Sequence, residues 1–174
     1  MVCSYGWLRD WIQFGLGTGL RPGEQAALRW SDVRLDEGTV RVRGTKTEGS
    51  AHPVPVAGEA LETLRRRAMA LADEGNGLVF TGAGGGAVEM RYLSKRLQKL
   101  AASADIAKNV TAYSLRHSYG TKMAAAGVPL LDLARIMGTS VAMIERHYGH
   151  YCPERGAAHV RRVFGEEVSL DMQS

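Results

Sequence analysis

One stretch of this chain alternates its residues as a strand does, and the segments around it repeat with the period of a helix. Residues 40–43 alternate valine with arginine, and residues 51–56 place histidine or valine at every second position. A polar turn at 44–50 joins the two runs, so we expect two short antiparallel strands. A doubly wound parallel sheet needs many strands between its helices. The sequence therefore predicts an α+β domain that is mostly helical and has one small antiparallel sheet or hairpin.

Segments with the repeat of an amphipathic helix fill most of the remaining chain. Apolar residues recur every three or four positions in these segments, and a glycine ends most of them. The expected helices cover residues 5–16, about 22–30, 58–73, 90–104, 115–126, 130–137, 141–148 and 153–164.

Net charge, cysteine content and the length of apolar runs limit the partners and the cell compartment that we expect. The net charge of +4 permits a polyanionic partner but does not establish one. Cys3 and Cys152 lie at opposite ends of the chain and form no disulfide framework or metal pair. No apolar run approaches the roughly 20 residues that span a bilayer, and the first residues lack the features of a signal peptide. We therefore expect a cytoplasmic protein without a membrane partner.

Four segments place a cation or a phenol at the boundary of an expected element. They are TGLRPGEQAALRWSDV at 18–33, GTKTEGSAHPVPV at 44–56, YSLRHSYGTKMAAAG at 113–127 and MGTSVAMIERHYGHY at 137–151. Each has an ordinary explanation when taken alone. Arg21 and Lys46 could be surface residues in turns, Arg116 could be half-buried beside a carboxylate, and Tyr148 could be a core residue with its hydroxyl at the rim.

Taken in order, these segments resemble the motifs of the tyrosine recombinases, the phage-integrase family. The resemblance extends over about residues 10–151, and it includes the 32-residue interval from Arg116 to Tyr148. It implies the fold of that family's catalytic domain, which we assign to residues 1–151. We expect residues 152–174 to be a tail whose helix could contact another subunit. We also expect the amino-terminal core-binding domain of the family to be absent.

The resemblance also implies a role for each residue of the set, and phosphate chemistry explains these roles. Arg21 and Arg116 would clamp the scissile phosphate, because guanidinium groups match its geometry and remain charged. Tyr148 would attack phosphorus and form a 3′-phosphotyrosyl link. Lys46 would protonate the departing 5′-oxygen. Glu24 would hold the start of the helix and orient Arg21 without contacting the phosphate itself.

Two positions depart from the family pattern. The family usually has histidine three residues before the second arginine, where this chain has Tyr113. It usually has histidine or tryptophan nine residues before the nucleophile, where this chain has Thr139. Both hydroxyls can still donate a hydrogen bond, but neither titrates near pH 7. Thr139 could instead be the N-cap of the last motif helix. His117 is adjacent to Arg116, so by spacing it does not replace the missing histidine.

The implied activity is cleavage and rejoining of double-stranded DNA without a metal or cofactor. The enzyme would act as a homotetramer on DNA and be a monomer when free. A type IB topoisomerase and a catalytically silent DNA-binding module remain as alternatives. The basic face formed by Arg91, Lys95 and Lys99 is a candidate DNA contact. The glycine-rich segment 81–87 and the His147–His150 pair match nucleotide and metal motifs poorly.

Overall fold

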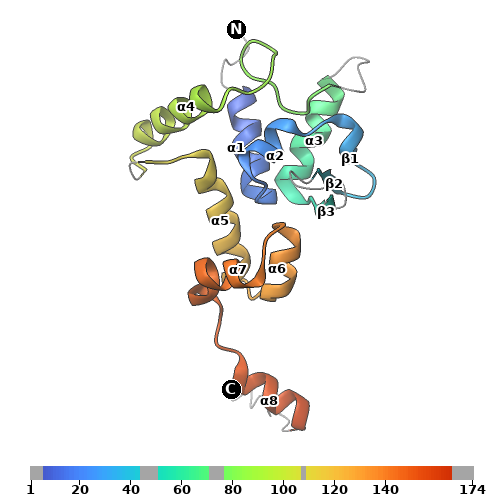
Figure 1. The fold of residues 1–174 in the computed structure, drawn as a ribbon, viewed down its shortest axis with the longest axis vertical. Coiled ribbons are helices and arrows are strands. Elements are labelled where there is room, and N and C mark those ends of the chain that lie inside the picture. Colours follow the sequence, from blue (N-terminus) through green and yellow to red (C-terminus); the bar gives the residue numbers. More distant parts are fainter. Residues whose placement is uncertain (1–5, 44–50, 71–76, 107–108, 166–174) are drawn as a thin grey trace, which may run out of the picture.

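The computed structural model describes residues 6–43, 51–70, 77–106 and 109–165. In chain order the elements are α1 Gly6–Thr18, α2 Pro22–Ala27, the 3-10 helix η1 Trp30–Asp32, β1 Val33–Arg34, β2 Thr39–Val42, β3 His52–Pro55, α3 Gly58–Ala70, α4 Met90–Ser103, α5 Ala112–Ala125, α6 Leu130–Ile136, α7 Val141–Tyr148, the 3-10 helix η3 Gly149–Tyr151 and α8 Gly156–Phe164. The expected α+β class is confirmed (Figure 1).

The sheet has three antiparallel strands in the order β1-β2-β3. Val40 on β2 lies opposite Val33 on β1 and Val54 on β3, and these side chains turn into the core. The first strand was not expected from the sequence. It is two residues long, and a run of two residues is too short to show an alternation.

The first of two hydrophobic clusters lies between the sheet and helices α1, α3 and α4. Phe14 and Trp11 of α1 both contact Phe80, with ring centroids 4.9 and 5.7 Å apart. The buried carboxylate of Asp10 accepts hydrogen bonds from Arg66 at 2.8 Å and Arg67 at 3.0 Å. These bonds tie α1 to α3, so both helices are fixed beside the sheet.

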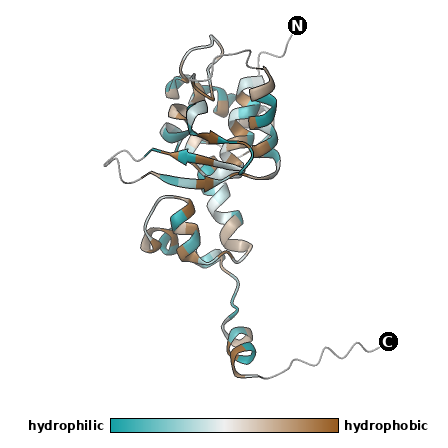
Figure 2. Cartoon of the chain, turned by 90° about the vertical axis from the view of Figure 1, so that its right-hand side faces the viewer, coloured by the Kyte–Doolittle hydropathy of each residue, from teal (hydrophilic) through white to brown (hydrophobic). Residues whose placement is uncertain are grey.

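The second hydrophobic cluster lies between α5, α6 and α7. Helix α5 belongs to both clusters, because Leu115 packs into the first and Tyr119 packs into the second. Figure 2 shows α5 passing from the sheet side of the molecule to the smaller helical group. Tyr148, at the end of α7, is part of the second cluster.

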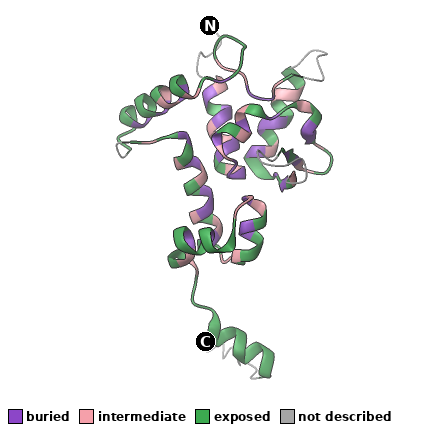
Figure 3. Ribbon diagram, in the orientation of Figure 1, coloured by how far each residue is buried: buried purple, intermediate pink, exposed green. Residues whose placement is uncertain are grey.

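Helix α8 lies away from both clusters, and Figure 3 shows it exposed along its whole length. Its large apolar side chains are Val160, Val163 and Phe164, which are 58, 69 and 80% exposed. No helix in the described ranges is long and apolar enough to cross a membrane.

The expected helix over about 22–30 is shorter in the structure. It ends at Ala27, because the chain then pairs with residues 77–79. Val79 donates to the carbonyl of Leu28 at 2.8 Å, and Trp30 donates to the carbonyl of Gly77 at 3.2 Å. This long-range pairing takes the backbone groups that a longer helix would have used, and local periodicity does not predict it.

Candidate functional site

A hollow of about 260 Å³ lies where the start of α2, the first half of α5 and the loop between α6 and α7 meet. It contains five of the expected catalytic residues, namely Arg21, Tyr113, Arg116, Thr139 and Tyr148. Met137, Met143, Ile144, His117 and His147 complete the lining. The sixth expected residue, Lys46, lies outside the described residues, in the segment that joins β2 to β3.

Arg21 is held at the N-terminus of α2. Pro22 is the first residue of this helix, a position that suits its fixed φ and missing N–H. Glu24, one turn further on, accepts from the Arg21 backbone N–H at 2.9 Å and from its Nη1 at 2.7 Å. The Arg21 Nη2 donates to the carbonyl of Gly138 at 2.8 Å. Glu24 and the Gly138 carbonyl therefore fix the Arg21 guanidinium at the wall of the hollow.

Among the described residues, the hydrogen bonds of the Arg116 guanidinium go to backbone carbonyls and not to a carboxylate. Its Nη1 donates to the carbonyl of Gly19 and its Nη2 to the carbonyl of Met137, both at 2.8 Å. Burial and the neighbouring Arg21 guanidinium lower the pKa of Arg116. Two like charges in one hollow repel each other, and an anion bound between them offsets this repulsion.

Tyr148 lies on the buried face of α7, with 5% of the residue exposed. Its hydroxyl lies 3.2 Å from Nδ1 of His117. Burial raises the pKa of Tyr148, and the nearby Arg116 charge lowers it by less. The phenol therefore keeps its proton near neutral pH, and a nucleophilic role requires a group to receive that proton.

The motif comparison does not identify His117, because its position next to Arg116 does not match the family motif. Its position on the helix face does indicate it. His117 follows Tyr113 by four residues and precedes Gly120 by three, so the three share one face of α5. That face lies against α7, and it brings the imidazole to the Tyr148 hydroxyl.

Gly120 was also missed, although it makes room for the phenol ring. A Cβ at this position would lie 2.7 and 2.8 Å from the Cε1 and Cε2 atoms of Tyr148. No such contact can form without displacing the ring, since both helices are packed in the second cluster. Gly120 therefore sets the depth at which the phenol lies.

We expect Gly120→Ala to slow the DNA cleavage that the sequence resemblance implies by about 10²-fold, because a shift of about 1 Å at a reacting atom can have this effect. The measurement is single-turnover formation of covalent adduct. Alanine favours helix, so the domain should still fold. Gly6→Ala, at a position with open space, is the control. Parent-like cleavage by Gly120→Ala would show that the ring position is not critical.

The alternative interpretation of Thr139 as a helix cap is wrong, because Ser140 occupies that position. The Ser140 side chain accepts from the backbone N–H of Met143 at 3.3 Å. Thr139 lies one residue earlier and lines the hollow. It follows Gly138, whose carbonyl is bound by Arg21 and whose φ is +60°. Tyr113 is more exposed, at 54%, and lies at the rim.

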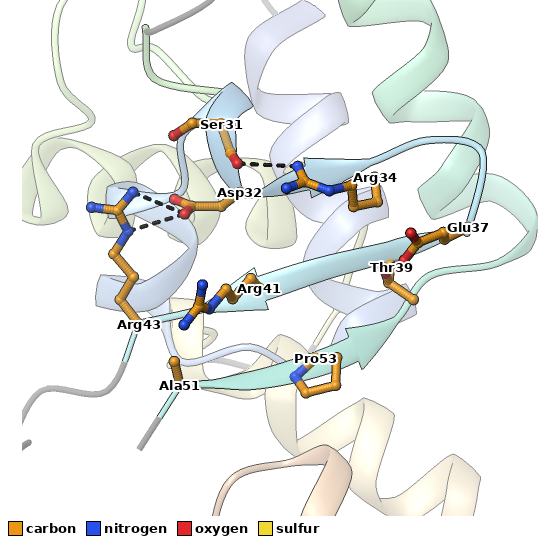
Figure 4. Close-up of a pocket in the computed structure, with 9 residues that line it drawn as sticks. All are labelled: Ser31, Asp32, Arg34, Glu37, Thr39, Arg41, Arg43, Ala51 and Pro53. Carbon is orange, nitrogen blue, oxygen red and sulfur yellow. Dashed lines mark hydrogen bonds and ion pairs between the residues drawn. The ribbon is translucent and has the colours of Figure 1, made fainter. Parts of the chain in front are cut away.

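A second hollow, of about 370 Å³, lies on the outer face of the sheet (Figure 4). Arg34, Arg41 and Arg43 border it, and Arg43 donates to Asp32 at 2.9 and 3.0 Å. None of the expected catalytic residues lines this hollow. The expected DNA contacts Arg91, Lys95 and Lys99 lie apart from both hollows, exposed on α4.

In the described part of the chain, no group of three or more His, Cys, Asp or Glu side chains is placed to hold a metal ion. His147 lines the first hollow, whereas the ring of His150 lies 4.0 Å from that of Tyr151. The two histidines of the HxxH pair thus have different surroundings.

Comparisons of sequence and of structure with known proteins point to the same family. The sequence profile of the Phage integrase family matches residues 2–155. Tyrosine recombinase XerC of Xanthomonas campestris pv. campestris is 31% identical over 142 residues, which are 82% of this chain and 44% of the relative. The chain spans less than half the length of this and similar curated relatives.

Solved structures of related fold include the Tn1549 transposon integrase in complex with circular intermediate DNA. Its TM-score is 0.73 at 22% identity, over 88% of this chain and 59% of that one. The XerH site-specific recombinase, in a post-cleavage complex with a palindromic difH substrate, has a TM-score of 0.72 at 23% identity, over 96% of this chain and 48% of that one. At these identities the likeness concerns the fold.

Proposed function

The chain belongs to the phage integrase family, and from this membership we propose that it cleaves and rejoins double-stranded DNA through Tyr148. One observation carries the proposal: two guanidinium groups and a buried phenol line the same hollow. Guanidinium groups bind phosphate oxygens in pairs and stabilise the charge that develops as phosphorus is attacked. The Tyr148 phenol can form an ester with phosphorus, and it lies inside the hollow, whereas the phenol of Tyr113 is 54% exposed.

In this proposal Arg21 and Arg116 hold the non-bridging oxygens of the scissile phosphate. Their bonds to the carbonyls of Gly19, Met137 and Gly138 fix both groups, and further N–H groups remain for the phosphate. Tyr113 and Thr139 donate hydrogen bonds from the rim and the loop. Lys46 protonates the 5′-oxygen from the segment between β2 and β3, as the family resemblance implies. No step in this scheme uses a metal or cofactor.

The DNA partner is supported by the related structures, in which the Tn1549 integrase and XerH are bound to DNA. The exposed row Arg91, Lys95 and Lys99 on α4 offers three cations to the phosphate backbone. We assign residues 1–151 to the catalytic domain and the remainder to a tail.

The tail includes α8, and we propose that it binds a second copy of this chain when DNA is present. The apolar side chains of Val160, Val163 and Phe164 have no partner in the described chain that buries them. A palindromic substrate such as that of XerH offers two equivalent half-sites, and in this proposal two copies of this chain occupy the two half-sites of such a DNA. Four copies would then join two such sites.

We expect Val163→Asp to reduce assembly on DNA while leaving the isolated domain folded. Placing a charge on the apolar face of α8 disfavours its burial against a neighbour. Mass photometry with and without a nicked duplex measures the assembly, and Arg162→Asp is the matched control for added negative charge. Equal assembly by Val163→Asp and the parent would exclude α8 as the contact.

The proposed function is tested with nicked suicide duplexes, in which the short fragment that carries the released 5′-hydroxyl diffuses away and the adduct accumulates. The duplexes carry the DNA that flanks the gene, with the difH sequence as a second probe. We expect an adduct that survives denaturation. Relaxation of plasmid supercoils without any site preference would favour the topoisomerase alternative. Specific binding without adduct would favour the silent DNA-binding module.

A further inference from the structure

The hydroxyl of Tyr148 has an imidazole partner that the motif comparison does not supply. Nδ1 of His117 lies 3.2 Å from the phenolic oxygen, and the two ring centroids are 6.0 Å apart. Among the described residues, His117 makes the hydrogen bond recorded for this hydroxyl. The imidazole comes from α5 and the phenol from α7, so tertiary packing holds the pair together.

The geometry points to His117 as the catalytic residue that accepts the Tyr148 proton when the phenol attacks phosphorus. This role rests on the proposed strand transfer. The family usually has a histidine three residues before Arg116, where this chain has Tyr113. We assign the imidazole to His117, the residue that follows Arg116.

The step balances in both directions. The Tyr148 oxygen forms a bond to phosphorus, the bond from phosphorus to the 5′-oxygen breaks, and the phenolic proton moves to Nδ1. Lys46 supplies the proton that the leaving 5′-oxygen takes up. In rejoining, the 5′-hydroxyl gives its proton to Lys46 and attacks phosphorus, the bond from phosphorus to Tyr148 breaks, and His117 returns its proton to the phenol. The imidazole must carry its resting proton on Nε2 for this to occur.

The other groups in the hollow cannot take this role. Arg21 and Arg116 are cations, and a guanidinium does not give up its proton in a protein. Tyr113 and Thr139 are hydroxyl groups with little basicity. The His147 ring centroid lies 6.2 Å from the phenol ring, about as near as that of His117, but among the residues that the structure describes the hydrogen bond of the Tyr148 hydroxyl is to His117. His117 is thus the base within reach of the reacting oxygen.

The order of events follows from where the charges lie. The free hollow holds two guanidinium groups and the Tyr148 phenol. A bound phosphate is held by both guanidinium groups and brings phosphorus to the phenolic oxygen. The phenolic proton is therefore transferred to His117 as the bond to phosphorus forms.

The first test compares His117→Ala and His117→Asn with the parent in single-turnover cleavage of the suicide duplex. We expect both to slow adduct formation by about 10²-fold or more, the usual loss for a missing general base. Asparagine retains an acceptor near the position of Nδ1 but cannot take up a proton at neutral pH. Added imidazole should restore part of the rate of His117→Ala. Parent-like cleavage by His117→Asn would overturn the proposal, because a hydrogen bond alone would then suffice.

A second substrate separates the two proton transfers. A 5′-bridging phosphorothiolate gives a thiolate leaving group, which departs without protonation. It should restore cleavage by Lys46→Ala, because that variant lacks the acid, and it should leave His117→Ala slow. Restoration of His117→Ala by the thiolate would overturn the proposal and make His117 part of the acid pathway.

The hydrogen bond is also measured without DNA. Long-range 1H–15N spectra of the parent and of Tyr148→Phe report the protonation of each His117 nitrogen. We expect Nδ1 to be an acceptor that shifts on loss of the hydroxyl. A proton resident on Nδ1 would overturn the role. Absence of any adduct in the parent would overturn the strand-transfer proposal instead, while the spectra still decide the pairing.

Discussion

Replacement of Tyr148 by phenylalanine is expected to abolish the covalent DNA adduct and to leave the domain folded. The substitution removes the phenolic oxygen and keeps the ring that packs against Gly120 and the second cluster. Without that oxygen, no bond to phosphorus can form at this position. The adduct should fall to the background of the assay, the largest effect we expect of a single substitution in this chain.

The measurement is a denaturing gel of the suicide-duplex reaction, together with thermal melting of the variant. Tyr151→Phe is the matched control, since Tyr151 lies three residues further along and its side chain is exposed. Mass spectrometry of the parent adduct should locate the linked nucleotide on Tyr148. An undiminished adduct in Tyr148→Phe, or a link mapped to Tyr151, would reject the assignment.

Exchange of either Arg21 or Arg116 for lysine is expected to slow cleavage by about 10²-fold or more, as loss of one donor to a transition-state oxygen commonly does. Lysine keeps the charge but loses the planar group that binds two oxygens at once. At Arg116 it also cannot reach the carbonyls of Gly19 and Met137 together.

Adduct formation and unfolding must be measured side by side for these variants. Arg65→Lys on α3 is the control, because Arg65 pairs with Glu62 on the outer surface. Normal cleavage by both variants would remove the phosphate clamp from the proposal. Loss of folding in both would assign the arginines a structural role.

Much of the fold could be predicted from local periodicity. The strands around 40 and 54 and the helices later seen as α1, α3 and α4–α8 follow from the spacing of apolar residues. Contacts between distant segments could not be predicted this way. The end of α2 depends on pairing between Leu28 and Val79, and β1 exists because β2 lies beside it.

The candidate site shows the same division. Motif spacing identified Arg21, Arg116, Tyr113, Thr139 and Tyr148, and the structure gathers them in one hollow. Motif spacing overlooked His117 and Gly120, whose importance depends on which face of α5 meets α7. It also left the surroundings of Tyr148 open, since burial in the second cluster determines how tightly the phenol holds its proton.

The division of the core into two clusters has a consequence for how activity can fail. Arg21 lies next to the first cluster, beside the sheet, and Tyr148 is part of the second cluster. Arg116 donates hydrogen bonds to both sides, to the carbonyl of Gly19 and to that of Met137. The distance from Tyr148 to Arg21 therefore depends on how the two clusters, which we call two packing units, are joined through α5. Bending of α5 would misalign the site while each unit stayed folded, so heat or denaturant should abolish adduct formation before either unit melts.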